Sequence, residues 1–462
     1  MSRSYDLVVI GAGAAGEKAA VQAAYFGKSV CVIDRGPAGG AWVNTGTIPS
    51  KTLRESALSL ADARRRGNGA ALHVRDVMAL ERRLVARWRE KVEHGLRSHG
   101  VTRMTGHASF VGEHLVSVTG HDGSITEVEA ANVLLATGSR PRQVPFAAVD
   151  GVRVHDSDTI LTLAEVPKEL VVLGGGVIAC EYASLFQALG VQVTLYNSQD
   201  RLLGWLDPEA STLLERIFAE AGMVIRHKVR ATSVEALEKG VAVQTDDGAM
   251  GRADACLLAL GRVPNTGDLN LSAAGLETTE WGTLDTDEFM RTTQPHIYAA
   301  GDVVGFPSLA SVSMEQGRVA SAHMFAIERG PMPDLFPNGV FTIPEVSCVG
   351  LDERAAAEQG IDAVSGSAGY HHSVRSAMLG DETGMVKLVV ERTTGRLLGA
   401  TLVGAQATEL IHYAAAVIHY GGTVMELTRF VFNLPSLSVL YKQAAYDVLH
   451  RMRTGDHNEM VD

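Results

Sequence analysis

The chain has 462 residues, of which 46% are hydrophobic and 20% are charged, values typical of a globular protein in solution. A chain of this length exceeds what one hydrophobic core can organise, so we expect several domains. The formal net charge of -12 argues against binding to nucleic acid or to an anionic membrane, because either partner requires a basic surface. No apolar run approaches the roughly 18 residues of a membrane span.

The four cysteines are scattered through apolar segments, and no pair of them has the spacing of a redox motif or a metal site. We therefore interpret them as buried and reduced. Only five residues precede the first strand-like run, which leaves no room for a signal peptide. These features predict a cytoplasmic protein without a bound metal that acts on small diffusible ligands.

The chain opens with a predicted βαβ unit, made of a strand over 7–10, a helix over 17–26 and a second strand that ends at Asp34. The first turn carries the GxGxxG pattern, with glycines at Gly11, Gly13 and Gly16. The first glycine permits a tight turn, the second lets backbone N–H groups approach a pyrophosphate, and the third lets helix and strand pack closely. Asp34 lies 23 residues after Gly11, where a carboxylate can bind both hydroxyls of an adenosine ribose.

The same pattern recurs over 170–196, as a strand, a glycine turn, a helix and another strand. The turn residues that we expect to bind a second nucleotide are Gly174, Gly176, Val177 and Ala179, with alanine in place of the third glycine. The ribose-reading position, 23 residues after the first glycine, holds Asn197, and Ser198 follows it. An acid there would favour NAD and an arginine NADP, so we expect both nucleotides to be accepted with little discrimination. Arg201 either assists a phosphate or is an ordinary surface arginine.

Further glycine-rich turns stand between and after these units, at Thr137-Gly138, at Gly261 and at Gly301-Asp302. Together with the two βαβ units they resemble the flavoprotein disulfide reductases, and the resemblance covers nearly the whole chain. Within that family the chain is most similar to the soluble transhydrogenase branch. The strings that carry this likeness are Gly46–Lys51, Cys180–Ser184, Asp200–Leu203 and Gln406–Glu409.

The resemblance implies an α/β fold with two Rossmann-like dinucleotide-binding domains, one for FAD and one for NAD(P), and a C-terminal α+β dimerisation domain. The first part of the FAD-binding domain would span 1–150, and the NAD(P)-binding domain 151–270. A central segment over 271–337 would complete the FAD site, and 338–462 would form a homodimer. The FAD-binding residues would be Gly11, Gly13, Gly16, Asp34, Thr137, Gly138, Gly301 and Asp302, and Gly261 would join the NAD(P) site.

The resemblance also implies an ion pair between Lys51 and Glu181 beside flavin N5. The lysine would stabilise negative charge on reduced flavin, and the glutamate would moderate the lysine. Asp302 would hold the ribitol chain of the flavin. The alternative for the pair is two unrelated surface charges.

The chain departs from the family where the redox disulfide belongs, because the two cysteine positions of the family fall on Trp42 and Thr47. Near the C-terminus the family carries His-Pro-x-x-x-Glu, its acid and base for the partner subunit, and here Leu434 and Val439 stand at the histidine and glutamate positions. The thiolate and the base that would activate it are absent together. We therefore expect electrons to leave the flavin by another route.

The replacement residues allow several interpretations. Trp42 would shield the flavin, stack on an acceptor, or fill the space left by sulfur. Thr47 would donate a hydrogen bond to the ring or only fill space. His371 and His372 adjoin each other on a predicted strand or loop, and without an acid or cysteine at metal spacing we do not expect them to bind a metal.

We expect a hydride to pass from NADH or NADPH to flavin N5 and then to a second nicotinamide, which requires one nicotinamide site used twice. Val177 favours this reaction, because related reductases often have a tyrosine lid there and a smaller residue leaves the pocket open. The alternatives are an NAD(P)H diaphorase or oxidase that acts on a quinone, a dye or oxygen, an FAD-binding redox sensor or scaffold, and an inactive relative. The sequence does not determine the acceptor, the direction of flux or the preferred nucleotide.

Overall fold

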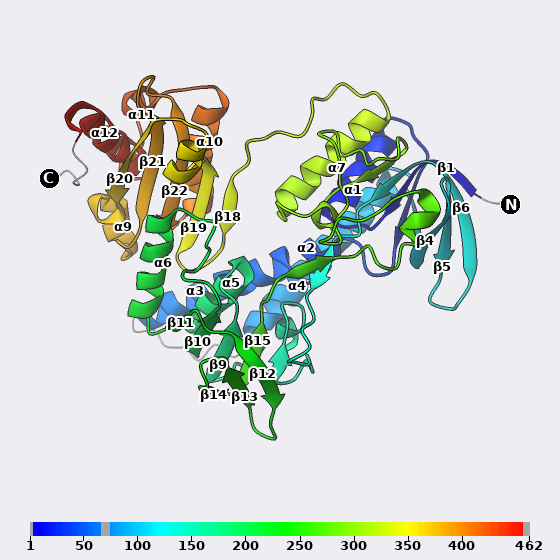
Figure 1. Ribbon diagram of the computed structural model, residues 1–462, viewed down its shortest axis with the longest axis horizontal. Coiled ribbons are helices and arrows are strands. Elements are labelled where there is room, and N and C mark those ends of the chain that lie inside the picture. Colours follow the sequence, from blue (N-terminus) through cyan, green and yellow to red (C-terminus); the bar gives the residue numbers. More distant parts are fainter. Residues whose placement is uncertain (1–2, 66–73, 456–462) are drawn as a thin grey trace.

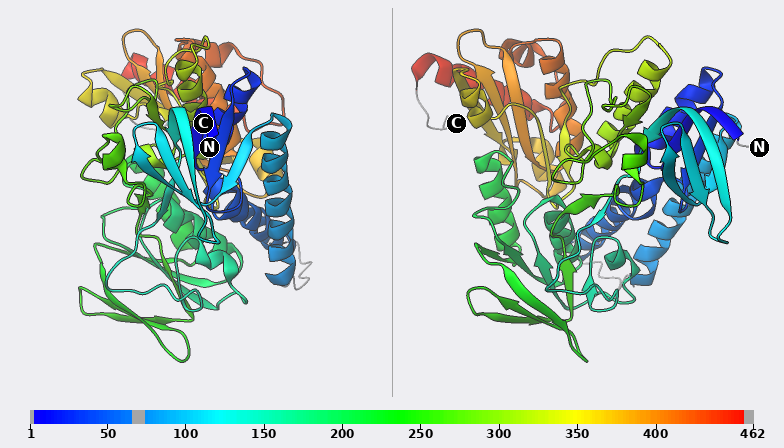
Figure 2. Two further views of the ribbon diagram at one scale, coloured as in Figure 1. Left: turned by 90° about the vertical axis from the view of Figure 1, so that its right-hand side faces the viewer. Right: turned by 45° about the vertical axis from the view of Figure 1, so that its right-hand side comes forward.

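The computed structural model describes residues 3–65 and 74–455, and the two ends of the described chain lie on opposite sides of the molecule (Figure 1). The molecule has three units, each with its own large sheet, and the second unit lies below the other two in both views of Figure 2. Among the described helices, none is long and apolar enough to cross a membrane.

The first unit has a seven-stranded sheet in the order β3-β2-β1-β6-β5-β4, with β17 paired to β6. β1 and β2 are parallel, with Leu7 opposite Val30, and both side chains are buried, as is typical of parallel strands covered on two faces. The strands are β1 Arg3–Ile10, β2 Val30–Asp34, β3 Thr102–Thr105, β4 His107–Gly112, β5 Leu115–Thr119, β6 Ile125–Leu135 and β17 Ile297–Ala299.

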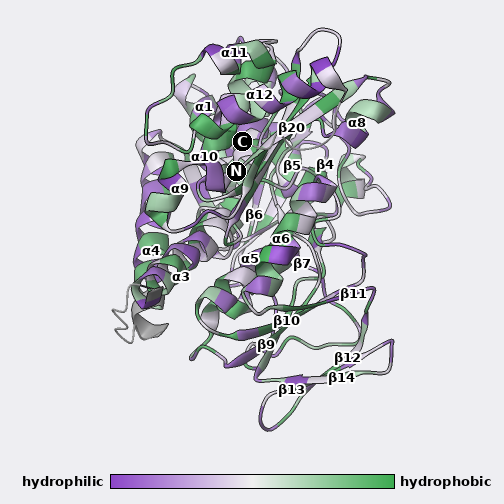
Figure 3. Cartoon of the chain, turned by 90° about the vertical axis from the view of Figure 1, so that its left-hand side faces the viewer, coloured by the Kyte–Doolittle hydropathy of each residue, from purple (hydrophilic) through white to green (hydrophobic). Residues whose placement is uncertain are grey.

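Helices from two distant parts of the chain cover this sheet. α1 and α7 lie side by side (Figure 1), and Gly317 permits their close approach, because a Cβ there would lie 2.1 Å from the carbonyl oxygen of Ala15. α4 mixes hydrophobic and hydrophilic residues along its length (Figure 3), as expected for a helix with one buried face. The helices are α1 Ala14–Tyr25, α2 Gly40–Asn44, α3 Thr47–Arg65, α4 Val74–Ser98 and α7 Ala310–Met324.

The second unit has a parallel sheet in the order β11-β10-β9-β15-β8 and a small antiparallel sheet of β12, β13 and β14. Its large sheet comprises β8 Val154–His155, β9 Glu169–Leu173, β10 Gln192–Asn197, β11 Val224–His227 and β15 Ala255–Leu258, with helices α5 Val177–Ala188 and α6 Pro208–Glu220. The small sheet comprises β12 Ala231–Ala236, β13 Val241–Thr245 and β14 Met250–Ala253. Two strands that pair with each other, β7 Ser139–Pro141 and β16 Arg262–Pro264, lie where the chain enters and leaves this unit.

The earlier units also contain three short 3-10 helices, η1 Thr159–Thr162, η2 Leu271–Ala274 and η3 Asp302–Val304. The third unit has an antiparallel sheet with strands in the order β18-β19-β22-β21-β20. Its strands are β18 Asn338–Val340, β19 Glu345–Gly350, β20 Ala363–Gly369, β21 Met385–Glu391 and β22 Leu397–Gly404. Its helices are α8 Glu353–Glu358, η4 Tyr370–His372, α9 Val374–Leu379, α10 Ala407–His419, α11 Val424–Arg429 and α12 Val439–Thr454. A separate hydrophobic core joins its sheet to α10 and α12.

The predicted fold class is confirmed: two α/β dinucleotide folds precede a C-terminal α+β unit. The expectation of a strand or loop at His371 and His372 is wrong, because both residues lie in the short 3-10 helix η4, with ring centroids 4.0 Å apart. Within the described ranges 3–65 and 74–455, no three His, Cys, Asp or Glu side chains lie close enough together to hold a metal ion.

Candidate functional site

The first glycine turn is organised around the Asp34 carboxylate. Its Oδ2 accepts a hydrogen bond from the Ala12 amide at 2.6 Å, and its Oδ1 accepts one from the Gly36 amide at 2.8 Å. Gly11 has a φ of +107°, and a Cβ there would lie 2.3 Å from the Ala136 carbonyl oxygen. The turn therefore requires glycine at this position, and the acid predicted from sequence spacing lies beside it.

A cavity lies next to this turn and is lined in part by it. Asp34 and the Gly11 backbone form one wall, and segments 106–108 and 265–269 contribute to the others. Thr137 also lines the cavity, and its hydroxyl oxygen is buried without a hydrogen-bond partner. Because buried polar groups are normally satisfied, an unpartnered hydroxyl at a cavity wall fits a site that receives a polar ligand.

Asp302 is oriented by residues on both sides of the second unit. The Ser139 hydroxyl donates to Asp302 Oδ2 at 2.7 Å, and the Arg262 Nε atom donates to the same hydroxyl at 2.7 Å. Arg262 also donates through its Nη2 atom to the Ser139 carbonyl oxygen at 2.9 Å. The β7–β16 pair thereby connects the two dinucleotide folds and aims the Asp302 carboxylate. Gly138, Gly261 and Gly301 have φ values of +67°, +99° and +85°. Each of these predicted positions therefore has a left-handed backbone conformation, which favours glycine.

Lys51 and Glu181 form the predicted ion pair, with 2.7 Å between Lys51 Nζ and Glu181 Oε2. The pair joins α3 of the first unit to α5 of the second, and the Glu181 side chain is 9% exposed. Phe341 completes the group, because its backbone N–H donates to Glu181 Oε1 at 2.8 Å and its ring lies 4.9 Å from Lys51 Nζ. A carboxylate with both oxygens engaged holds the lysine in one place.

The two replacement residues lie at opposite ends of a short turn. Trp42 packs against Trp88 of α4 with ring centroids 5.8 Å apart, and its indole N–H is buried without a partner. Thr47 is exposed at the start of α3. Between them, Asn44 donates to the carbonyl oxygens of 37, 38 and 40, and Arg89 donates two hydrogen bonds to its side-chain oxygen. The roles of Trp42 as a shield, a stacking partner or a space-filling residue all stay predictions.

The cysteines stand apart from this turn. Cys31, Cys180 and Cys256 are buried, Cys348 is partly buried, and all four are free. Burial raises the pKa of the Cys31 thiol to about 12. Cys180 adjoins Glu181 in the sequence, but its sulfur lies 3.6 Å from the Gly175 carbonyl oxygen, and burial above all raises its pKa. Thiols of this kind are protonated at neutral pH and are poor nucleophiles.

The second glycine turn has the same backbone form and a different polar partner. Gly174 has a φ of +123°, Val177 begins α5, and Ala179 is fully buried. Asn197 is only 2% exposed, and its amide is engaged within the protein, whereas Ser198 is exposed. The Arg201 guanidinium donates to the Gly204 carbonyl oxygen at 2.9 Å.

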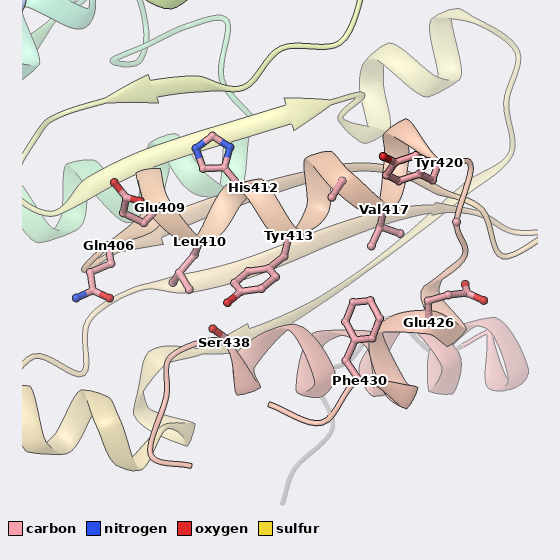
Figure 4. Close-up of a pocket in the computed structure, with 12 residues that line it drawn as sticks. Gln406, Glu409, Leu410, His412, Tyr413, Val417, Tyr420, Glu426, Phe430 and Ser438 are labelled. Carbon is pink, nitrogen blue, oxygen red and sulfur yellow. The ribbon is translucent and has the colours of Figure 1, made fainter. Parts of the chain in front are cut away.

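The C-terminal unit carries a surface hollow of about 750 Å³, lined by α10, α11 and the residues that follow each of them. Tyr413 and Phe430 point into the space between α10 and the segment after α11 (Figure 4). Nearby, Val431 is 95% exposed and Leu434 is 77% exposed. Exposed apolar side chains of this kind gather at protein interfaces.

Several residues of the site were missed by sequence reasoning. Phe341 and Ser139 reach it through tertiary contacts, and neither has a local signature. Arg262 directly follows Gly261, one of the predicted glycine positions, so its place near the site can be inferred from the sequence. His227 and Glu215, which support Asn197, lie 30 and 18 residues beyond it in the sequence.

Comparison with known proteins agrees with this geometry. Residues 5–317 match the family described as pyridine nucleotide-disulphide oxidoreductase, and residues 336–445 match its dimerisation domain. The soluble pyridine nucleotide transhydrogenase of Mycobacterium tuberculosis is 39% identical over 460 residues, which cover 98% of each chain. The Pseudomonas putida protein of the same name is 36% identical over 459 residues, 97% of this chain and 99% of that one.

Solved structures show the same similarity. The crystal structure of LpdA from Mycobacterium tuberculosis superposes with a TM-score of 0.89 at 32% identity, covering 96% of this chain and 99% of that chain. The HOCl-induced flavoprotein disulfide reductase RclA from Escherichia coli gives a TM-score of 0.88 at 27% identity, with the same coverage. The two glycine turns, the Lys51–Glu181 pair between them and these matches lead to one conclusion: the chain belongs to the pyridine nucleotide-disulphide oxidoreductase family.

Proposed function

We propose that this protein is an FAD-dependent oxidoreductase that carries a hydride from one nicotinamide nucleotide to another without disulfide chemistry, as a soluble transhydrogenase does. The observation that carries the proposal is the Lys51–Glu181 pair, which lies between two nucleotide turns in a chain whose four thiols are elsewhere. The names of the relatives in Mycobacterium tuberculosis and Pseudomonas putida support the same reaction.

FAD fits the first unit through three features of this chain. The Gly11 turn offers backbone N–H groups to a pyrophosphate, the Asp34 carboxylate suits ribose hydroxyls, and the unpartnered Thr137 hydroxyl lines the cavity. Asp302, which accepts a hydrogen bond from Ser139, would hold the rest of the cofactor. The other residues of the proposed FAD site are Gly13, Gly16, Gly138 and Gly301. When bound, FAD accepts a hydride from a reduced nicotinamide and returns it to an oxidised one.

Lys51 would act as a stationary positive charge for this chemistry. Glu181 holds its ammonium group at 2.7 Å, and the Phe341 amide holds Glu181 in turn. A charge held in position stabilises negative charge that develops nearby more effectively than a mobile one does. Trp42 and Thr47 supply neither a thiolate nor a base, so these residues would shape the site and take no part in electron transfer.

NADH and NADPH would share the second unit, with the pyrophosphate at the turn of Gly174, Gly176, Val177 and Ala179, and Gly261 at its edge. Asn197 and Ser198 present no charge that would repel or attract a 2′-phosphate. One undiscriminating site used twice suits a reaction whose donor and acceptor are both nicotinamide nucleotides.

The protein would work as a homodimer formed through its 338–462 region, for which the exposed Val431 and Leu434 are suitable contact residues. Leu434 and Val439 in place of an acid and a base would make the contribution of the partner subunit apolar. The division at 150, 270 and 337 into FAD-binding, NAD(P)-binding and central segments remains part of this proposal.

An anaerobic assay with NADPH as donor and thio-NAD as acceptor tests the reaction. We expect parallel double-reciprocal lines as both substrates are varied, the pattern of one site used in two half-reactions. Dihydrolipoamide and glutathione disulfide should not react. Flavin that is reduced by NADPH but reoxidised only by quinone, dye or oxygen would make the protein a diaphorase. Flavin that a nucleotide reduces but that none of these acceptors reoxidises would favour a redox sensor, and flavin that neither nucleotide reduces would favour a scaffold or an inactive relative.

A further inference from the structure

Asn197 occupies the last position of β10 and uses its amide inside the protein. Its Nδ2 donates to the Arg201 carbonyl oxygen at 2.8 Å, and its Oδ1 accepts from the Gln199 amide at 3.2 Å. One partner is an acceptor and the other a donor, so together they determine which way the amide points. The remaining N–H group of Asn197 faces His227 Nδ1 at 3.2 Å.

His227 links Asn197 to a carboxylate, that of Glu215, through a series of hydrogen bonds. It ends β11 and stands directly opposite Asn197 in the register of the parallel pair, at the carboxyl edge of the sheet. Because Asn197 donates to Nδ1, that nitrogen accepts and the ring proton is on Nε2. His227 Nε2 lies 3.2 Å from Glu215 Oε2, and Glu215 Oε1 accepts from the Leu202 amide at 2.5 Å. The chain Glu215–His227–Asn197 is therefore consistent in donors and acceptors from end to end.

These three hydrogen-bonded side chains hold the loop over 198–206 against the second glycine turn. A Cβ on Gly175 would lie 2.4 Å from Asn197 Oδ1, so the amide packs directly on the turn. The Leu203 amide donates to the Gly175 carbonyl oxygen at 2.8 Å, and Leu203 has a φ of +47°. Glu215 and Asn197 thus bind the loop at Leu202 and Arg201, which lie between the exposed residues Ser198 and Gly204.

We propose that Glu215 and His227 are positioning residues for nicotinamide nucleotides: through Asn197 they hold loop 198–206 in its binding form. Ligands of open α/β sheets bind at the carboxyl ends of the strands, where both Asn197 and His227 lie. This inference rests on the proposed use of the second unit for NADH and NADPH. Under this proposal, Glu215 and His227 affect the affinity for both nucleotides without contacting either nucleotide.

The test is a pair of substitutions at His227 in the FAD-loaded protein. His227→Leu removes the acceptor for Asn197 and the donor to Glu215, and we expect the dissociation constants of NADH and NADPH to rise together by about tenfold. The kcat at saturating nucleotide should not change, because a displaced loop affects binding and leaves the Lys51 group intact. His227→Gln restores a side-chain acceptor and should recover most of the affinity.

His296→Leu is the matched control, since this histidine lies on the first unit and contacts the Glu113 carbonyl oxygen. Direct titration of each nucleotide separates the two possible failures. If wild type binds neither nucleotide, the proposed function is wrong. If wild type binds both and His227→Leu binds them equally well, or His227→Gln fails to recover what His227→Leu has lost, the positioning role is wrong.

Discussion

The two glycine turns have similar backbone conformations and differ in the side chain that packs against them. At the first turn, the Asp34 carboxylate accepts two backbone N–H bonds and lines an open cavity. At the second, the Asn197 amide is 2% exposed and bonds to its own loop and to His227. The first site is therefore built around a carboxylate that lines a cavity, and the second around a loop held by the Asn197 amide, His227 and the Glu215 carboxylate. Under the proposed function, the same motif would serve a resident cofactor at the first turn and an exchangeable substrate at the second.

The turns also differ in how they are anchored. The first unit is closed by the contact of α1 with α7 at Gly317. The second is tied to the C-terminal unit by Lys387, whose Nζ lies 2.9 Å from Asp207, 3.0 Å from Glu209 and 2.7 Å from Glu353. Burial alone would lower the pKa of Lys387, but hydrogen bonds and charges from Glu353 and Asp207 outweigh it and raise the pKa. Asp207 also caps α6, directly after the loop over 198–206.

The largest expected effect comes from breaking that anchor. Lys387→Met leaves the buried Asp207 without its cation, and we expect a loss of about 3 to 5 kcal/mol in unfolding free energy. Thermal and urea unfolding measure the loss, and Lys239→Met, at an exposed lysine of the second unit, is the control. Equal stability of the two variants would show that the cluster does not anchor the second unit.

Removing the charge at the first turn should release the cofactor. Asp34→Asn weakens two charge-assisted hydrogen bonds of the turn and the contact proposed for the ribose, so FAD affinity should fall by roughly 10²-fold. The ratio of flavin to protein absorbance after gel filtration, followed by FAD reconstitution, measures this. Asn197→Ala should retain FAD fully. Retention of FAD by Asp34→Asn would contradict a site built around this charge.

The group between the turns should affect rate rather than occupancy. Lys51→Met should keep FAD, yet slow reduction of the flavin by NADPH on the order of 10²-fold, because the cation held by Glu181 is lost. Anaerobic stopped-flow absorbance follows the reduction. A variant reduced as fast as wild type would remove Lys51 from the reaction.

The smallest effect concerns nucleotide choice at the second turn. Wild type should use NADH and NADPH with kcat/KM values within roughly 10² of each other, since only modest polar contacts distinguish them. Ser198→Glu adds a charge at an exposed position and should favour NADH by a further tenfold or so, through repulsion of the 2′-phosphate. Ser198→Gln, similar in size and neutral, should not. Equal behaviour of the two variants would mean that Arg201 or another residue sets the choice.

The sequence predicted most of what is local and little of what is assembled. Both turns, Asp34 and the ends of the strands follow from motif spacing, and the Lys51–Glu181 pair, 130 residues apart, followed only from the family resemblance. Asn197 was assigned to ribose recognition, but nothing near it in the sequence shows that His227 and Arg201 already engage its N–H groups. Phe341, Ser139 and Lys387 act through contacts between units, which periodicity and propensity do not report.

The central claim, that the flavin alone carries the electrons between two nicotinamides, is tested most directly by an anaerobic single turnover. The FAD-loaded protein is titrated with NADH and then mixed with one equivalent of thio-NADP. We predict uptake of two electrons per FAD, no thiolate-to-flavin charge-transfer band, and one thio-NADPH formed per flavin. Uptake of four electrons, a charge-transfer band on partial reduction, or reduced flavin that thio-NADP cannot reoxidise would contradict the account.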